Sequence, residues 1–314
     1  NIIDEKVFSK LKTLGLPTSE ICDDSTFLRR TSLDIAGRLP TLEETDKYLN
    51  SDNPNKRSEW IDSLLSTTDY AEFFANKWSS ILRNKRKADT YTRGTQAFHE
   101  WIRQSFHINK PYNQFVAELV TARGEISHNP ATAWFRNVTD QKERLQDTAQ
   151  VLLGVRLQCA ECHHHPYEKW SQQDYYGFSA FFSRIGKKKT DMPGEEAVFH
   201  NVGLATAKNP KTGQNVKPTP LGGDELDILA EDDPRDDLAS WITDEKNPFF
   251  APMLVNRYWK HFFNRAIVEP EDDMRVTNPP TNPELLQALS NQFISTGYDI
   301  KDLIRTCLLY TSDA

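Results

Sequence analysis

Apolar residues recur three or four positions apart along most of the first 185 residues of the chain, a spacing that is typical of amphipathic helices. Thr41 and Glu44 form a capping-box pattern at the start of one such segment, and further helix starts are indicated at 53–54 and 68–69. Aromatic residues follow the same spacing and predict a packed core rather than a cofactor-binding face. These residues include Tyr70, Phe73, Phe74, Trp78, Phe98, Trp101 and Phe106.

The character of the chain changes at 186–232, where glycine, proline and lysine are frequent. The pattern at 197–202 predicts a strand, and 209–213 predicts a turn between two short extended pieces. Helical spacing returns after this stretch. We therefore expect a mostly α fold, with one helical lobe at 1–185 and a second at 233–314, joined by a small connector that contains a β-hairpin.

The composition excludes several classes of protein. The chain has 314 residues, of which 38 are Lys or Arg and 45 are Asp or Glu, and its formal net charge is −7 at pH 7. This balance argues against a general nucleic-acid binder, which needs a concentrated basic face. The sequence has no apolar run long enough for a transmembrane helix, and its four cysteines are too few for a disulfide-built scaffold. Because the chain starts at Asn1 and stops after an amphipathic pattern at 307–314, we expect the natural protein to extend beyond both ends.

Two of the four cysteines lie in the CAECH segment at 159–163. Helical spacing at 147–162 predicts a helix that continues through Cys162, so that Cys159, Cys162 and His163 share one face. Covalent haem attachment needs that arrangement, because two thiols must reach the porphyrin vinyl groups while the adjacent imidazole binds iron. The aromatic residues that follow could supply an apolar wall for such a cofactor. They are Trp170, Tyr175, Tyr176, Phe178, Phe181 and Phe182.

The same cluster allows two other interpretations. Cys159, Cys162, His163 and His165 could bind zinc, although four ligands within seven residues are closer together than usual zinc spacings. Cys159 and Cys162 could also form a redox disulfide or remain an inert pair, but no thioredoxin-like pattern surrounds them. Covalent haem is the interpretation that we prefer, with His163 as the proximal iron ligand. The distal ligand stays open. His165 is too near His163 to reach the opposite face of the haem, and each other candidate is better explained as a surface or packing residue: Met192, Met253, Met274, His99, His107, His128, His164, His200 and His261.

Charged clusters have simpler interpretations. The basic runs at 83–87 and 187–189 are interpreted as solvated loops, either of which could steer an anionic partner protein. The acidic residues at 269–273 lie in a Pro-flanked loop and are expected to face water. Hydrolase and kinase motifs are absent from the sequence, which leaves open whether the protein is an enzyme.

Four blocks of the sequence resemble the paired domains of unknown function that are abundant in Planctomycetes and their relatives. The resemblance extends over nearly the whole chain. The N-terminal part is similar to the domain associated with planctomycete cytochrome c modules, and the C-terminal part is similar to its usual companion domain. The blocks are FLRRTSLD with GRLPT at 27–41, LGVRLQCAECH with HP and DYYG at 153–177, NPFF with LVNR at 247–257, and DDMRVTNPP at 272–280.

The resemblance implies an extracytoplasmic protein, since haem is attached to such a motif outside the cytoplasm, and it implies no settled activity. The four candidate ligands match the family pattern, whereas His164 stands where Asn or Asp is usual and Met274 stands where Phe is usual. We expect a periplasmic or otherwise extracytoplasmic electron-transfer protein with c-type haem, working with a redox partner protein or an exported protein complex. The alternative is a zinc-binding structural module that interacts with exported proteins or glycans.

Overall fold

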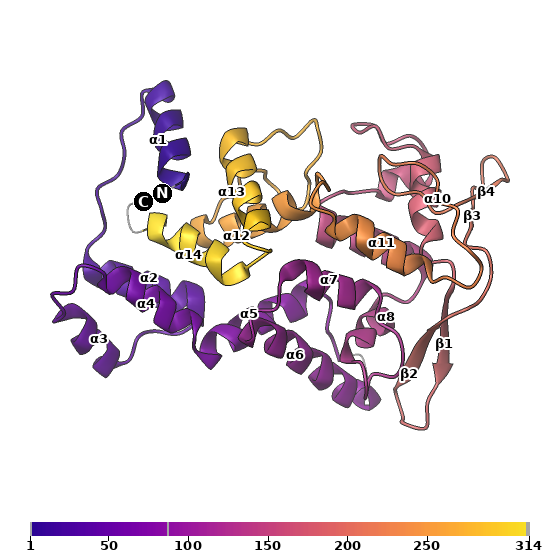
Figure 1. The fold of residues 1–314 in the computed structure, drawn as a ribbon, viewed down its shortest axis with the longest axis horizontal. Coiled ribbons are helices and arrows are strands. Elements are labelled where there is room, and N and C mark those ends of the chain that lie inside the picture. The colour runs from indigo at the N-terminus through magenta and orange to yellow at the C-terminus, as the bar shows by residue number, and fades with distance from the viewer. Residues whose placement is uncertain (1, 87, 312–314) are drawn as a thin grey trace.

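The structure of the chain is a computed structural model that describes residues 2–86 and 88–311 (Figure 1). It is mostly helical, as the sequence predicts. The N-terminal segment contains α1 (Ile2–Leu14), α2 (Asp24–Ala36), α3 (Leu42–Leu49), α4 (Lys56–Leu65), α5 (Thr68–Ile81), α6 (Thr92–His107), α7 (Tyr112–Val120), α8 (Ala133–Asn137), α9 (Gln141–Asp147) and α10 (Gln172–Ala180). The C-terminal segment contains α11 (Pro234–Thr243), α12 (Phe250–Phe263), α13 (Pro283–Ser295) and α14 (Ile300–Thr311).

Short turns join several of these helices. Three are 3₁₀ turns and one, η3, is a π-helical turn that continues α9. They are η1 (Asp89–Tyr91), η2 (Pro130–Thr132), η3 (Thr148–Leu152) and η4 (Gln158–Glu161). No helix within the described ranges is both long and apolar enough to cross a membrane.

Of the predicted helix starts, those of α3 and α5 have side-chain caps, whereas α4 begins at Lys56 without one. The Thr41 hydroxyl accepts a hydrogen bond from the Glu44 amide (3.1 Å), and the Glu44 carboxylate accepts one from the Thr41 amide (2.7 Å), so the capping box is confirmed. Arg38 donates to both Glu44 oxygens at 2.8 Å and to Asp69 at 2.6 Å. This guanidinium therefore ties the start of α3 to the first turn of α5.

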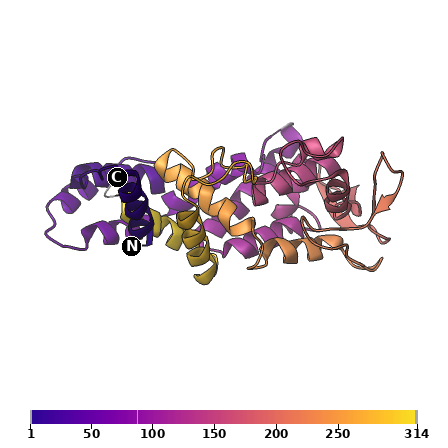
Figure 2. The same ribbon diagram turned by 90° about the horizontal axis from the view of Figure 1, so that it is seen from above.

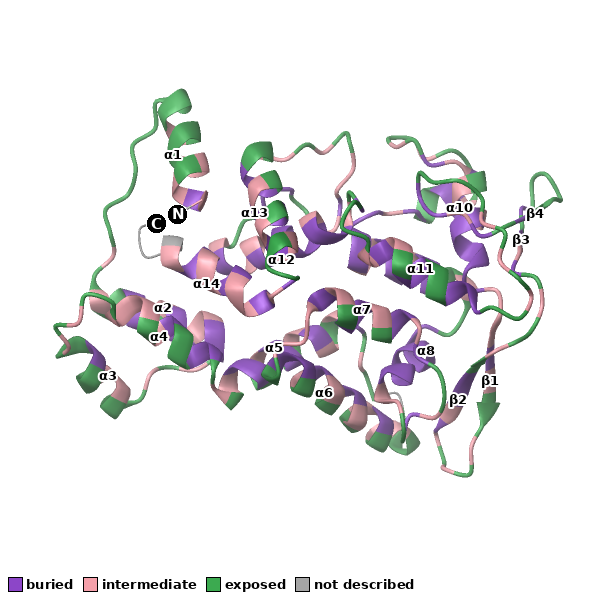
Figure 3. Ribbon diagram, in the orientation of Figure 1, coloured by how far each residue is buried: buried purple, intermediate pink, exposed green. Residues whose placement is uncertain are grey.

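The helices of the two segments share one hydrophobic core. Phe74 of α5 stacks on Tyr258 of α12 at a centroid distance of 5.6 Å, and Tyr112 of α7 stacks on Phe250 at 4.9 Å. Each fully buried ring of this kind stabilises the fold by about 1.5–3 kcal/mol. In addition, α11 lies on α7, and α14 lies between α1 and α4 (Figures 1 and 2). Buried residues run through both segments in Figure 3, so the aromatic stripes are core residues as predicted.

The connector contains two small antiparallel hairpins. In the larger one, β1 (Ile185–Lys189) pairs with β2 (Glu196–His200), and Gly124 bridges to Val198. In the smaller one, β3 (Ala207–Lys208) pairs with β4 (Asn215–Val216) around the predicted turn. The predicted strand at 197–202 thus exists but ends at His200.

The interpretation of the lysine run at 187–189 as a loop is wrong, because these residues form most of β1. Lys187 is half-buried and donates to the Phe135 carbonyl at 2.5 Å, while Lys188 and Lys189 are exposed. The apolar residues of β2 supply the pairing partner that a lysine-rich strand lacks on its own. Burial lowers the pKa of Lys187.

The basic run at 83–87 is only partly solvated. Arg83 adopts a φ of 54° just after α5 and forms a 2.6 Å ion pair with the buried carboxylate of Asp147. Burial raises the pKa of Asp147 to about 6, and Arg83 opposes that rise. Lys85 and Arg86 are exposed, as predicted, whereas Lys87 lies outside the described residues.

A buried side-chain amide on α12 helps to hold the loop between α12 and α13. Asn256 of α12 is fully buried, and its amide nitrogen donates to the carbonyls of Val268 (2.8 Å) and Glu271 (3.3 Å). Its amide oxygen accepts from the Val268 amide at 2.9 Å. Backbone groups in this loop would otherwise be buried without partners, which costs about 1–3 kcal/mol each.

Replacing Asn256 by Ala therefore removes the partner of two buried backbone groups of Val268 and of the half-buried Glu271 carbonyl. We expect Asn256→Ala to lower the free energy of unfolding by about 2–4 kcal/mol, measured by urea denaturation followed by circular dichroism. Asn291→Ala, at an exposed position of α13, is the matched control and should change it by less than about 0.5 kcal/mol. Equal effects of the two changes would contradict this role of Asn256.

Candidate functional site

The helix predicted at 147–162 does not reach the cysteines, so that prediction is wrong. After η3 the chain reaches Gly154, whose φ is +67°. The Gly154 amide donates to the Gln150 carbonyl (3.2 Å) and the Val155 amide to the Ala149 carbonyl (2.9 Å), which closes the helix end. A residue without a Cβ is favoured at this left-handed position, and the helix therefore stops there.

The motif begins instead on the separate turn η4. The Cys159 carbonyl accepts from the amides of Cys162 and His163, each at 3.3 Å. Cys159, Cys162 and His163 are exposed, while Ala160 between them is fully buried. One tight turn therefore presents both thiols and the imidazole at the surface.

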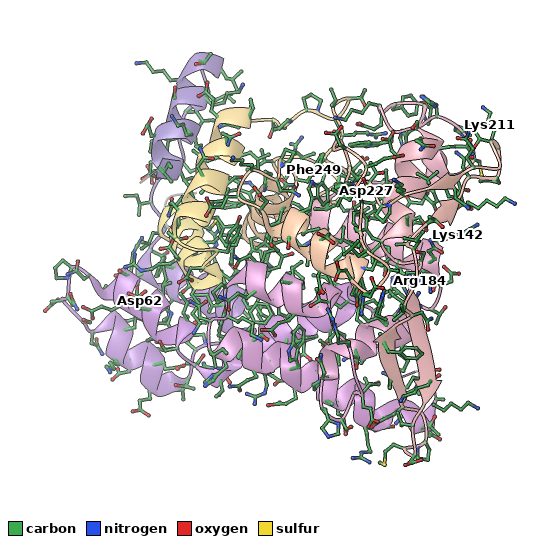
Figure 4. All side chains as sticks on the ribbon, turned by 45° about the vertical axis from the view of Figure 1, so that its right-hand side comes forward. Asp62, Lys142, Arg184, Lys211, Asp227 and Phe249 are labelled. Carbon is green, nitrogen blue, oxygen red and sulfur yellow. The ribbon has the colours of Figure 1, made fainter. Side chains whose placement is uncertain are left out.

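Glu161 anchors this turn on α10. Its backbone carbonyl accepts from Gln172 Nε2 (2.9 Å) and the Tyr176 hydroxyl (3.3 Å). Its carboxylate accepts from the Tyr175 hydroxyl (3.4 Å) and forms an ion pair with Lys142, which Figure 4 labels. Burial and the nearby Glu161 charge raise the pKa of both tyrosines, so their hydroxyls stay protonated and can donate.

Sequence reasoning missed this anchor. The signal was present in Ser171 and Asp174, which form a capping box at the start of α10. Recognising it would have placed a helix directly after the motif, with its polar residues facing back toward Glu161.

The three histidines of the motif have different hydrogen bonds. His163 Nδ1 lies 2.6 Å from the His164 carbonyl, so this nitrogen must donate, and in the neutral ring Nε2 keeps a free lone pair. His165 Nδ1 instead accepts from the Tyr167 amide at 3.3 Å, which places the proton of a neutral ring on Nε2. His164 is exposed. Of the two rings with these bonds, His163 is the one whose Nε2 is ready to bind a metal.

The aromatic residues after the motif are mainly core residues. Trp170, Tyr175, Phe178, Phe181 and Phe182 are buried, and Tyr176 is half-buried. The Phe178 ring lies 6.0 Å from Trp241 of α11, and the Trp170 ring lies 6.2 Å from Phe249, which Figure 4 labels. Their packing joins the motif segment to the C-terminal helices rather than leaving a wall free beside the thiols.

A small pocket of about 80 Å³ lies beside the motif, between it and the loop before α13. The lining residues include Gly154, Arg156, His165, Trp170, Asp273 and Met274. The two loops that form it are joined directly, since the Val276 amide donates to Glu168 (2.8 Å) and the Thr277 hydroxyl to the Tyr167 carbonyl (3.3 Å). Of the three methionines considered as distal ligands, Met274 is the one that lines this pocket, together with His165.

The acidic loop does not simply face water, which corrects its interpretation from sequence. Asp273 is buried, lies 3.1 Å from Arg275 and 3.8 Å from Arg156, and Asp272 forms an ion pair with Arg156 and accepts from Gln150 at 2.5 Å. Burial opposes ionisation of Asp272, but the hydrogen bonds from Gln150 and Arg156 outweigh it and lower the pKa of this carboxyl. These carboxylates fasten the loop to the segment that leads to the motif.

No three His, Cys, Asp or Glu side chains in the described part of the chain are grouped so that they could hold a metal ion. Cys22, Cys159, Cys162 and Cys307 are all free thiols, and Cys307 is buried in α14. The arrangement thus defines a mostly helical protein with an exposed CxxCH turn at the junction of its N- and C-terminal segments.

Two family models match the chain. Residues 2–187 match PSCyt2, described as a protein of unknown function (DUF1549), and residues 234–314 match PSD1, described as a protein of unknown function (DUF1553). The first match covers more than half of the chain, which therefore belongs to the PSCyt2 family, and the expected pairing of the two domains is confirmed. No curated protein and no solved structure matched the chain.

Gly154 offers a direct test of how the junction is held. A Cβ at this position would lie 2.5 Å from Met274 Cγ and 2.8 Å from Met253 Sδ, in addition to the strain of a positive φ. We expect Gly154→Ala to lower the free energy of unfolding by about 2–4 kcal/mol in urea denaturation.

Gly297→Ala is the matched control, because Gly297 has a φ of +71° but open space around its Cβ position. It should cost only the backbone strain, about 1–2 kcal/mol. If the two variants lose the same stability, the close approach of Met253 and Met274 to Gly154 has no energetic consequence.

Proposed function

We propose that this chain is an extracytoplasmic electron-transfer protein that carries one covalently attached c-type haem. The sulfurs of Cys159 and Cys162 would form the two thioether bonds, and His163 Nε2 would bind the iron. When bound, such a group supplies one-electron chemistry at its iron. Attachment of haem to this motif takes place outside the cytoplasm, which is the basis for the proposed location.

The observation that carries the proposal is the state of three side chains: Cys159 on η4, and Cys162 and His163 directly after it. Both thiols are exposed and free, and His163 holds its Nδ1 proton against a backbone carbonyl while Nε2 is left to bind. A histidine that ligates a metal usually donates its other ring N–H in this way, which fixes the tautomer and the ring orientation. The donor set therefore fits a c-type haem.

The surroundings of the motif favour transfer of electrons to another protein. The pocket beside it, about 80 Å³, is much smaller than the roughly 300–1,000 Å³ of usual ligand pockets, so the group would lie at the surface. Glu161, held by α10, would keep the turn in place while a partner docks. A redox partner protein or an exported protein complex is the corresponding partner.

The same geometry makes the zinc alternative the weaker proposal. A tetrahedral site would need His165 beside the two thiolates, but the Nδ1 of this ring accepts from the Tyr167 amide, so its Nε2 carries the proton. The cluster would have to give up that bond and rearrange before four ligands could converge.

Expression of the chain with an export signal, in a host that attaches c-type haem, tests the proposal. We expect the purified protein to keep its Soret band after acid–acetone extraction and to show a haem-staining band on a denaturing gel. Cys159→Ala and Cys162→Ala should each reduce covalent haem at least about tenfold, because each change removes one of the two thioether bonds.

Cys22→Ala is the matched control, because Cys22 is a free, half-buried thiol remote in sequence from the motif, and it should leave the haem content unchanged. A haem-free protein with one equivalent of zinc, lost in both motif variants, would replace this proposal with the zinc-binding module. A protein with neither group would leave the cysteines as a dithiol pair and would also contradict haem attachment.

A further inference from the structure

The two basic runs of the sequence, at 83–87 and 187–189, belong to segments that meet in the structure. The first run lies in the loop that leads from α5 through η1 to α6, and the second forms most of β1. In Figure 1 the end of the β1–β2 hairpin lies beside the start of α6. Positive charges that are far apart in the sequence are therefore gathered in one region of the molecule.

Two contacts join the loop and the turn of the hairpin. A Cβ at Gly194, in that turn, would overlap the Thr90 carbonyl, so the two backbones touch at a position where only glycine fits. Arg93, in the first turn of α6, donates from Nη1 to Met192 Sδ at 3.7 Å. The loop and the hairpin turn thus form one continuous surface.

The exposed cations of the two segments lie close to these contacts. Lys189 is opposite Glu196 in the hairpin, two residues from the glycine of the turn. Lys85 directly follows Asn84, whose side-chain amide donates to the Thr95 carbonyl in the first turn of α6 at 2.9 Å. We call these cations the basic surface: Lys85, Arg86, Arg93, Lys188 and Lys189.

The cations of the basic surface have little counter-charge. Four of the five form no ion pair with any described residue, and the fifth, Arg86, lies 3.7 Å from Asp89. Both side chains of that pair are more than half exposed, and ion pairs of this kind contribute little. The positive charges therefore remain available to a partner.

The acids of the hairpin do not cancel this charge. Glu195 is buried, and Glu196 lies 3.7 Å from Lys187, which is not part of the basic surface. Asp191 is exposed. The described residues of the two segments thus present five exposed cations against two exposed acids, in a chain whose formal net charge is −7.

The basic surface has no apolar anchor. No large hydrophobic side chain is exposed in the described residues of 83–93 and 187–196, and Tyr91 and Met192 are only partly exposed. Protein interfaces usually centre on aromatic or aliphatic side chains that become buried, and helices that lie in a membrane surface also insert such groups. A row of separate cations instead fits a flexible polymer with negative charges repeated along its length.

We propose that the basic surface binds an acidic polysaccharide, a sugar chain that carries sulfate or carboxylate groups. Its Lys and Arg side chains would each donate charge-assisted hydrogen bonds to the oxygens of successive acidic groups along that chain. The surface shares no residue with the CxxCH turn, so this binding does not depend on haem attachment.

Dextran sulfate and polygalacturonate are the two acidic probes, and dextran is their uncharged counterpart. We expect the full chain to bind at least one acidic probe with a micromolar dissociation constant in calorimetry at low salt. Binding should weaken at least about tenfold when the salt concentration rises from about 0.05 M to about 0.3 M. Equal binding of dextran and the acidic probes, or no binding of either acidic probe, would overturn the proposal.

Variants in each segment locate the binding. Lys188→Gln with Lys189→Gln, in the hairpin, should weaken binding about tenfold, because two of the five cations are lost. Lys85→Gln with Arg93→Gln, in the loop and at the start of α6, should have an effect of similar size. All four side chains are exposed, so both double variants should fold, which circular dichroism checks.

Lys12→Gln with Lys246→Gln is the matched control. It removes the same charge from exposed residues of α1 and of the loop before α12, and it should leave the affinity unchanged. If the control and either double variant of the basic surface bind equally well, the two segments do not act as one site and the proposal is wrong. Tighter binding to phosphatidylglycerol vesicles or to polyglutamate than to both polysaccharides would replace the polysaccharide with a lipid surface or an acidic protein.

Discussion

At Gly154 the backbone enters the left-handed region, and this turn separates the π-helical end of α9 from the segment that carries the two thiols. The Gly154 carbonyl then accepts from the Met274 amide at 2.8 Å, which brings the loop before α13 against the same point. The end of the helix, the position of η4 and the contact between the two family segments at this point all depend on the turn at Gly154. A continuous helix would have carried the motif away from that loop.

The two matched family segments are joined by polar contacts as well as by packing. Arg156, two residues after Gly154, reaches Asp272 and Asp273, and Asn256 holds the same loop from α12. Beneath these contacts the aromatic core is continuous from α5 to α12. Because buried charges and amides are costly without their partners, neither segment can move far from the other without exposing both kinds of group. This interdependence gives a physical reason for the two domains to occur together in one chain.

Most of the fold could be predicted from the sequence, because helical spacing and caps are local signals. The capping box of Thr41, the aromatic core and the small turn at 209–213 are of this kind. The strand formed by lysines 187–189 could not be predicted from the sequence, because its stability comes from pairing with β2. At the site, the CxxCH motif is evident in the sequence, but the helix predicted to carry it is wrong, because the chain turns at Gly154. The anchor of Glu161 on α10 and the burial of Asp273 depend on contacts between residues distant in sequence.

The anchoring of η4 through Glu161 and Ala160 has a consequence for how this surface could evolve. The contacts that hold the turn are made by residues between the cysteines, whereas the Cys159 and Cys162 side chains are exposed and contribute little to packing. Substitution of the thiols is therefore nearly neutral for folding, and selection for a stable fold alone would not keep them. Relatives that have lost the cysteines should retain the same turn, and relatives that keep them do so for the chemistry of sulfur.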